Sequence, residues 1–139
     1  DIQHKFLRIG VRCQAYQDAH IMMMSASLLK EGDVVLVVSH SGRTNDLKSA
    51  VELAKKNGAK IICITHSYHS PIAKLADYII CSPAPETPLL GRNASARILQ
   101  LTLLDALFVS VAQQNIEQAT LNMQKTGAIV DFFSPGALK

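Results

Sequence analysis

The sequence predicts an α/β fold in which a doubly wound parallel sheet is covered by helices on both faces. The alternation of two kinds of segment predicts it. Short apolar runs such as Val34 to Val38 alternate along the chain with longer segments of helical periodicity. Strands of a parallel sheet are buried on both faces, so they read as continuous apolar runs. The expected architecture is a three-layer αβα arrangement of the flavodoxin-like kind.

The expected elements alternate between helix and strand for most of the chain. The ranges are helix 2–9, strand 11–16, helix 20–30, strand 33–39, helix 45–57, strand 60–65, helix 71–76, strand 78–82, helix 94–113 and helix 116–125. In the first helix, Ile2, Phe6 and Ile9 share one face. Residues from 129 onward show no periodicity, so we expect one domain over residues 1–125 and a tail over 126–139.

The middle of the chain carries the clearest helix signals. An apolar stripe at helical spacing runs through helix 45–57 and consists of Leu47, Ala50, Val51 and Ala54. Gly58 stands where a helix C-cap is expected, and Ser70 with Pro71 forms an N-cap followed by proline at the first helical position. Helix 94–113 is apolar on too many faces for a surface helix, so it is expected to pack on the sheet and on a second subunit.

Composition excludes several classes of function. The 139 residues are 48% hydrophobic and 18% charged, which fits one folded domain. A net charge of +3 with scattered Lys and Arg gives no electrostatic case for DNA binding by this chain itself. The odd number of cysteines, Cys13, Cys63 and Cys81, suggests small buried hydrophobes in a reducing cytoplasm. Neither a metal, another cofactor nor a membrane span is expected, because metal-ligand spacing is lacking and polar residues interrupt the apolar stretch 98–112.

A hydroxyl-rich turn directly follows the most apolar strand. Ser39, Ser41 and Thr44 lie with Gly42 between that strand and helix 45–57. The first turn of a helix leaves backbone N–H groups unpaired and carries positive partial charge, so a phosphate placed there meets preorganised donors. Hydroxyls add donors, and glycine lets the backbone approach a ligand closely. The turn therefore predicts a phosphate site made by these four residues.

An ordinary strand-to-helix turn, in which serine or threonine only caps the helix, is the alternative for this segment. Capping needs one hydroxyl, whereas the turn contains three. Ligand binding is therefore the favoured interpretation.

The pattern S-x-S-G-x-T between a valine-rich strand and a helix resembles the signature of the sugar isomerase (SIS) domain, a phosphosugar-binding module. Residues 59–65, 70–77 and 78–81 resemble that family's next strand, its short helix and the strand after. The segment 93–109 resembles the branch found in RpiR-type bacterial transcription regulators. The likeness covers most of residues 1–115.

The resemblance also implies a strand that this chain lacks. SIS domains have an earlier strand ending in a glycine- and serine-containing turn, and no such turn stands here. The chain opens at Asp1 inside a segment that already looks helical, without a cap before it. We therefore expect a fragment of a longer protein. RpiR-type regulators carry a helix-turn-helix domain upstream, and DNA would be contacted only through that domain.

Three further residues are expected near a bound sugar. His20 lies at the carboxyl edge of the sheet, where the resemblance implies a ligand contact; an exposed loop histidine is the alternative. Ser95 opens helix 94–113 and either completes a polar pocket or caps the helix. Glu86 stands in a proline-rich loop, in the region where phosphosugar isomerases use a carboxylate to move a proton; a solvated loop glutamate is the alternative.

These observations favour the effector-binding domain of an RpiR-type regulator, in which a bound sugar phosphate biases the geometry of a homo-oligomer and thereby its DNA affinity. An aldose–ketose phosphosugar isomerase, or the isomerase half of an amidotransferase, is the alternative, with Glu86 as the base and His20 or His66 as the acid or second base that such a reaction also needs. A purely structural oligomerisation module would leave the three hydroxyls without a task. The sequence identifies neither the sugar nor the sign of regulation.

Overall fold

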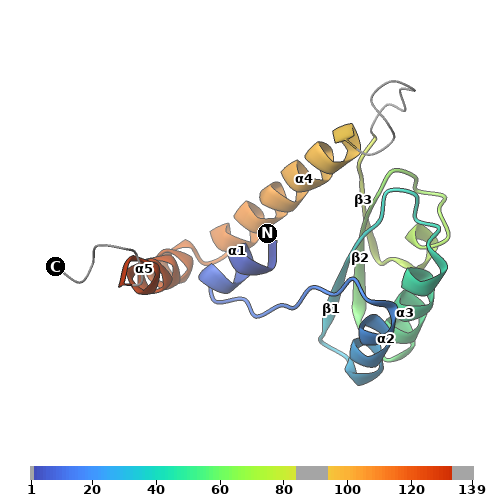
Figure 1. Cartoon of the computed structure of the whole chain (residues 1–139), viewed down its shortest axis with the longest axis horizontal. Helices are drawn as coiled ribbons and strands as arrows, with labels where there is room; N and C mark the ends of the chain where they lie inside the picture. Colours follow the sequence, from blue (N-terminus) through green and yellow to red (C-terminus); the bar gives the residue numbers. More distant parts are fainter. Residues whose placement is uncertain (1, 84–93, 133–139) are drawn as a thin grey trace. The chain divides into compact units, whose positions relative to one another are not determined.

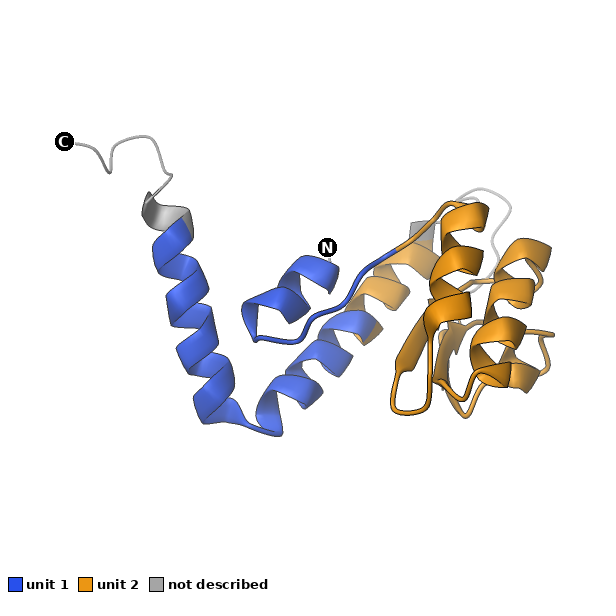
Figure 2. Ribbon diagram, turned by 90° about the horizontal axis from the view of Figure 1, so that it is seen from below, with its two compact units in different colours: residues 1–15, 104–139 blue, residues 16–103 orange. Residues whose placement is uncertain are grey.

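The computed structural model describes residues 2–83 and 94–132 (Figure 1). The chain forms two compact units (Figure 2). One unit consists of residues 16–103 and contains the sheet. The other consists of residues 1–15 together with residues 104–139, and its described part is helical.

The unit of residues 16–103 is built on a parallel sheet with the strand order β1-β2-β3. Its elements are α2 (Ala19–Leu28), β1 (Val34–Val38), α3 (Asn45–Lys56), β2 (Lys60–Thr65), the 3₁₀ helix η1 (Ala73–Leu75), β3 (Tyr78–Cys81) and the beginning of α4 (Ala94–Gln113). Parallel neighbours need a crossover connection, and α3 supplies it between β1 and β2. The predicted α/β fold with a parallel sheet is confirmed.

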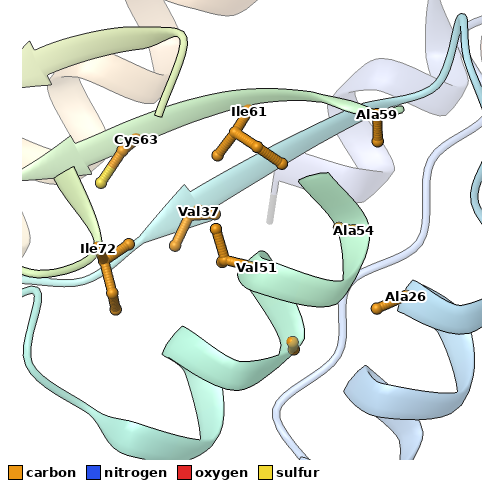
Figure 3. Packing of buried hydrophobic residues seen from close by; sticks show 9 residues of the cluster. Ala26, Val37, Val51, Ala54, Ala59, Ile61, Cys63 and Ile72 are labelled. Atoms are coloured by element: carbon orange, nitrogen blue, oxygen red, sulfur yellow. The ribbon is translucent and has the colours of Figure 1, made fainter. Parts of the chain in front are cut away.

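The core of this unit lies between α3 and one face of the sheet (Figure 3). The apolar stripe predicted for α3 is buried there, with Val51 and Ala54 each 1% exposed. Ile61 and Cys63 of β2 belong to the same buried cluster. Burial raises the pKa of the Cys63 thiol to about 11, so the thiol stays protonated at neutral pH. It therefore acts as a small core hydrophobe, as predicted.

The opposite face of the sheet is apolar but partly exposed. Successive residues of a strand point to opposite faces, so Val34 and Val38 of β1 point away from the cluster that contains Val37. These two valines are 59% and 39% exposed, and Tyr78 of β3 is 64% exposed. The core cluster of this unit therefore lies on the α3 side of the sheet.

The end of α3 agrees with the predicted C-cap glycine. Gly58 follows the C-cap residue Asn57 and has a φ of +92°, a backbone conformation that favours glycine. Asn57 Nδ2 donates a hydrogen bond to the Ala26 carbonyl oxygen at 3.0 Å. The end of α3 is thereby tied to α2.

The helical unit is formed by α1 (Ile2–Arg8), the later part of α4 and α5 (Ile116–Phe132). Phe6 and Ile9 are buried with Ala119 of α5. The rings of Phe6 and Phe108 meet edge to face with 5.9 Å between their centroids. Asn122 Nδ2 donates to the Ile9 carbonyl oxygen at 3.0 Å. The apolar face predicted for the first helix is confirmed.

The helix α4 is apolar and largely exposed. Ile98 is 68% exposed, Leu101 49% and Val109 48%. By length and composition, residues 95–113 could cross a membrane, with a mean hydropathy of 1.5, but one such helix is weak evidence because core helices of soluble proteins pass the same test. The contact of α4 with a second subunit stays a prediction.

The predicted strand 11–16 is wrong. Residues 11–16 belong to no strand, and each of them is exposed, including Cys13, whose predicted burial is therefore also wrong. A strand forms where a neighbour supplies partners for its backbone groups and its side chains bury an apolar row. This segment pairs with none of the strands β1, β2 and β3.

Two predicted helices differ in length from those in the structure. In place of helix 71–76 there is only the 3₁₀ turn η1. Ser70 caps this turn as predicted, because its Oγ accepts from Ala73 N at 3.2 Å. The turn stays short because Leu75 N and Ala76 N bond only three residues back, to Ile72 O and Ala73 O, and Ala76 is extended. The last helix, predicted to end at 125, continues to Phe132, so the beginning of the predicted tail 126–139 is helical. The tail beyond it lies outside the described residues.

Asp77 joins the beginnings of β2 and β3. Its Oδ2 accepts a hydrogen bond from Ile61 N at 2.7 Å, and its own N–H donates to Ile61 O at 2.8 Å. The bond from Ile61 N lowers the pKa of the Asp77 carboxyl, burial acts in the opposite direction, and the charges of Lys55 and Lys60 lower it further. The ionised carboxylate is therefore the form that the fold favours.

Asp77→Ala is expected to destabilise the protein at neutral pH. A carboxyl with a lowered folded-state pKa stabilises the fold above its unfolded pKa of about 3.9, and this contribution is lost as the pH falls through the folded pKa. The difference in urea midpoint between Asp77→Ala and the native protein should be present at about pH 7 and shrink once the pH falls below the unfolded pKa of the carboxyl. Asp77→Asn keeps an oxygen acceptor and serves as the control with a smaller effect. A difference that does not change with pH would contradict this account.

Candidate functional site

The predicted phosphate turn lies at the carboxyl edge of the sheet in the unit of residues 16–103. β1 ends at Val38, residues 39–44 form the turn, and α3 begins at Asn45. The loop of residues 66–70 after β2 and Ser82 after β3 leave the same edge. The carboxyl edge of a parallel sheet is where open α/β folds bind their ligands.

The two serines of the turn use their oxygens inside the turn and keep their protons. Ser39 Oγ accepts a hydrogen bond from Gly42 N at 3.2 Å, and Ser41 Oγ accepts one from Arg43 N at 3.3 Å. A hydroxyl that accepts in this way still has its O–H to donate. Both hydroxyls are therefore held by backbone N–H groups while a donor remains for a ligand oxygen.

Thr44 is the N-cap residue of α3, but its side chain makes no capping hydrogen bond. Its carbonyl oxygen accepts the first helical bond, from Lys48 N at 2.9 Å. The N–H groups of Asn45, Asp46 and Leu47 precede that bond and have no acceptor within the helix. Thr44 is thus the N-cap without using its hydroxyl, and both serines bond to the turn itself. Helix capping therefore does not explain the three hydroxyls.

Gly42 is required by packing as well as by conformation. Its φ of +60° lies in the left-handed region that favours glycine. A Cβ at this position would collide with Ser70 Oγ and lie 2.5 Å from Ser70 Cβ. Ser70 is 3% exposed, and the bond from Ile72 N to Gly42 O holds the two loops together. The sequence analysis predicted that Gly42 lets a ligand approach closely, and it did not predict this packing of Gly42 against Ser70.

Near the turn, the sequence analysis gave no role to Thr65 or His40 and named His66 only as a possible acid of an isomerase. Thr65 is fully buried, and its Oγ1 donates to His40 O at 3.2 Å. The rings of His40 and His66 lie with 5.2 Å between their centroids and are tilted by 37°. No motif along the chain marks these residues, because only the pairing of β1 with β2 brings them together. Their one sequence signal is a position directly at or after the end of an apolar strand.

The turn offers its donors without a buried charge. Arg43 is exposed, and Lys48 is paired with Glu52 at 3.2 Å, an exposed pair of a kind worth about 0–1 kcal/mol. Asp46 stands in the first turn of α3 and stabilises the helix N-terminus. The attraction for an anion therefore comes from the helix N-terminus and from neutral donors.

The predicted sugar contacts are not joined to the turn by any hydrogen bond in the described part of the chain. His20 lies in the first turn of α2 and is exposed, and Asp18 before it caps α2 by accepting from Ile21 N at 3.0 Å. Ser95 is half-buried and stands one residue inside α4, so it is not the N-cap. Glu86 lies outside the described residues. The roles of these three sugar-contact candidates stay predictions.

Metal ligands do not gather in the ranges 2–83 and 94–132. No three His, Cys, Asp or Glu side chains within these ranges are placed to hold a metal ion. Cys13, Cys63 and Cys81 are free thiols. The polar groups at the edge of the sheet are instead hydroxyls, backbone N–H groups and imidazoles.

The sequence matches one known family and a set of bacterial regulators. The family described as SIS domain matches residues 1–110. The HTH-type transcriptional regulator RpiR of Escherichia coli strain K12 is 92% identical over 139 residues, which is 100% of this chain and 47% of that protein. An uncharacterized HTH-type transcriptional regulator of Caldanaerobacter subterraneus is 37% identical over 130 residues, 94% of this chain and 46% of that protein. The chain thus spans about half the length of these curated relatives.

Solved structures share the fold. The Vibrio vulnificus NanR protein complexed with ManNAc-6P is 29% identical with a TM-score of 0.88 and covers 97% of this chain and 51% of that chain. The sugar isomerase domain of the RpiR transcription factor from Sphaerobacter thermophilus is 18% identical with a TM-score of 0.74 and covers 91% of this chain and 69% of that chain. The second likeness supports the fold alone.

Proposed function

Since this chain belongs to the SIS domain family, we propose that it is the sugar-phosphate-sensing part of a bacterial transcription regulator. The phosphate binds at the turn of residues 39–44, on the N-terminus of α3. DNA contact belongs to a helix-turn-helix domain elsewhere in the full-length protein, and the regulator acts in the cytoplasm as a homo-oligomer.

One observation carries the proposal, namely that the turn holds three hydroxyls of which none caps α3. Together with the N–H groups of the first helical turn, they offer about three to five donors to a phosphate, each bond being worth about 1.5–3 kcal/mol with a charged acceptor. Micromolar to millimolar binding needs about 4–8 kcal/mol after the costs of association. The turn is therefore sufficient to hold the phosphate of a small ligand.

The relatives support the ligand class and the regulatory role. A regulator of 92% identity is an HTH-type transcriptional regulator, and a structure with the same fold contains ManNAc-6P. A sensor must bind its ligand differently in two arrangements of the protein. Because Gly42 locks the loop after β2 against the turn, a ligand at the turn acts on both loops.

A sensor is favoured over an isomerase. Moving a proton between adjacent carbons needs a base together with an acid or a second base. The candidate base Glu86 lies outside the described residues, so the structure gives no geometry that joins it to either candidate acid, His20 or His66. The relatives named for transcription regulation favour the same choice.

A thermal-shift screen of the full-length protein tests the proposal. The panel contains hexose 6-phosphates, pentose 5-phosphates and amino-sugar 6-phosphates, with inorganic phosphate alongside. Ligand at about 100 times its Kd adds about 2.7 kcal/mol, so at least one sugar phosphate is expected to raise the Tm. Ser41→Ala removes one donor to a charged acceptor and is expected to weaken binding about 10- to 100-fold.

Ser49→Ala is the matched control, because Ser49 is an exposed serine of α3 outside the turn. This variant should keep the native shift. If neither a sugar phosphate nor inorganic phosphate raises the Tm of the native protein, the proposal is contradicted. Turnover of the sugar phosphate that binds would assign the site to an isomerase instead.

A further inference from the structure

A row of polar residues crosses the sheet beside the phosphate turn. The strand register aligns the last apolar row on this face as Val38, Ile64 and Ile80. Side chains alternate between the two faces along a strand, so the residues two positions further on, His40, His66 and Ser82, continue that row. The backbone pairing continues as well, because His66 N donates to His40 O at 3.0 Å. At the carboxyl edge, this face of the sheet thus ends in two histidines and a serine, one beyond each of the three apolar residues.

The described part of the protein leaves three polar atoms of this row without a partner. These atoms, Nδ1 of His40, Nδ1 of His66 and Oγ of Ser82, are buried and have no hydrogen bond among the described residues. The Ser82 side chain is fully buried. Buried polar atoms are normally paired, because an unpaired one costs the free energy of its desolvation. Packing of the fold alone does not account for three of them in one row.

Each of the two histidines is a partly exposed residue whose Nδ1 is buried. A ligand at this edge would therefore meet the ring at Nε2 rather than at Nδ1. A neutral imidazole carries its proton on one nitrogen and accepts at the other. No hydrogen bond among the described residues fixes the proton to either nitrogen, so each ring is free to donate from Nε2 to a ligand oxygen. With 5.2 Å between the ring centroids, the pair offers two neighbouring N–H donors.

We propose that His40 and His66 bind the sugar part of the ligand, their Nε2–H groups donating to its hydroxyl and carbonyl oxygens. This inference rests on the proposed function and adds to it the residues that distinguish a sugar phosphate from phosphate alone. Ser39 of the turn directly precedes His40, and the two side chains leave opposite faces of the strand end. A ligand that contacts both must therefore extend over the strand end, from the turn to the histidine pair.

Sugar oxygens fit this pair better than a metal ion does. Zinc sites in proteins use three or four side-chain ligands, and the described residues contain no such group of His, Cys, Asp or Glu. The Cys81 thiol is already engaged, because its Sγ donates to His66 O at 3.3 Å. Neutral N–H donors suit hydroxyl oxygens, whereas the phosphate is served by the turn and the helix N-terminus.

Titration calorimetry on the full-length protein tests this inference with ribose 5-phosphate, glucose 6-phosphate, ManNAc-6P and inorganic phosphate as probes. His66→Phe keeps a ring of similar size and removes its nitrogens. It is expected to raise the Kd of the best-bound sugar phosphate about tenfold, because one neutral hydrogen bond is lost, and to leave the Kd of inorganic phosphate unchanged. His40→Phe should act in the same way. His66→Gln, whose amide N–H lies near the place of Nε2, should recover part of the affinity.

His4→Phe is the matched control, since His4 is an exposed histidine of α1 in the other unit. It should change neither Kd. Unchanged sugar-phosphate affinity in both His40→Phe and His66→Phe would overturn the inference while leaving the proposed function intact. Equal weakening of sugar phosphate and inorganic phosphate would overturn it too, because the histidines would then act on the phosphate. A native protein that binds no sugar phosphate would instead refute the proposed function on which the inference rests.

Discussion

Replacing Gly42 with alanine is expected to destabilise the protein by about 2–4 kcal/mol and to abolish binding at the turn. Two effects add at this position. The φ of +60° strains any residue with a Cβ, and that Cβ would lie 2.5 Å from Ser70 Cβ, in a loop whose serine is 3% exposed. Relief of the collision requires the turn and the loop after β2 to separate. The hydroxyls of Ser39 and Ser41 would then lose the positions that their backbone bonds give them.

Gly32→Ala separates the two effects. Gly32 also has a positive φ, of +95°, but a Cβ there would meet nothing within 4 Å. Strain alone should cost about 1 kcal/mol in this control, measured as the free energy of unfolding in urea. The double variant Gly42→Ala with Ser70→Gly removes the collision and should recover part of the loss. Equal costs for Gly42→Ala and Gly32→Ala would show that the packing against Ser70 has no energetic weight.

Ile61→Ala is expected to cost about 2–5 kcal/mol of unfolding free energy. Ile61 is fully buried in the cluster between β2 and α3, and shortening it leaves a cavity that the surrounding residues cannot fill completely. Its N–H also bonds Asp77, so the backbone around the cavity is held in place. Ile21→Ala removes the same atoms from a side chain that is 48% exposed and should cost less than about 1 kcal/mol. A similar loss in both variants would contradict the assignment of Ile61 to the core.

The elements that the sequence predicted well are those whose signals are local. The run from Val34 to Val38, the stripe through α3 and Gly58 after it all act within a few residues, and the structure confirms each of them. The strand expected over 11–16 fails because a strand depends on a neighbour that local sequence does not supply. The end of α5 lay beyond prediction because its last residues lack an apolar period and yet remain helical.

In the candidate site too, the residues that were predicted are those whose signal is local. Ser39, Ser41, Gly42 and Thr44 are consecutive or nearly so, and their spacing before a helix was enough to predict an anion site. The partners of that turn come from other strands. Ser70 packs against Gly42 although the two residues are far apart in the sequence. His40 and His66 lie side by side only because β1 pairs with β2 in this register. Such contacts depend on tertiary structure, and the sequence marks the two histidines only by their position at or after the end of an apolar strand.

The position of the phosphorus atom in a crystal of the full-length protein with its sugar phosphate would test the central claim most directly. We expect the phosphate oxygens within hydrogen-bond distance of the hydroxyls of Ser39, Ser41 and Thr44 and of the backbone N–H groups that open α3. A phosphate bound elsewhere, with these three hydroxyls facing only solvent, would contradict the account.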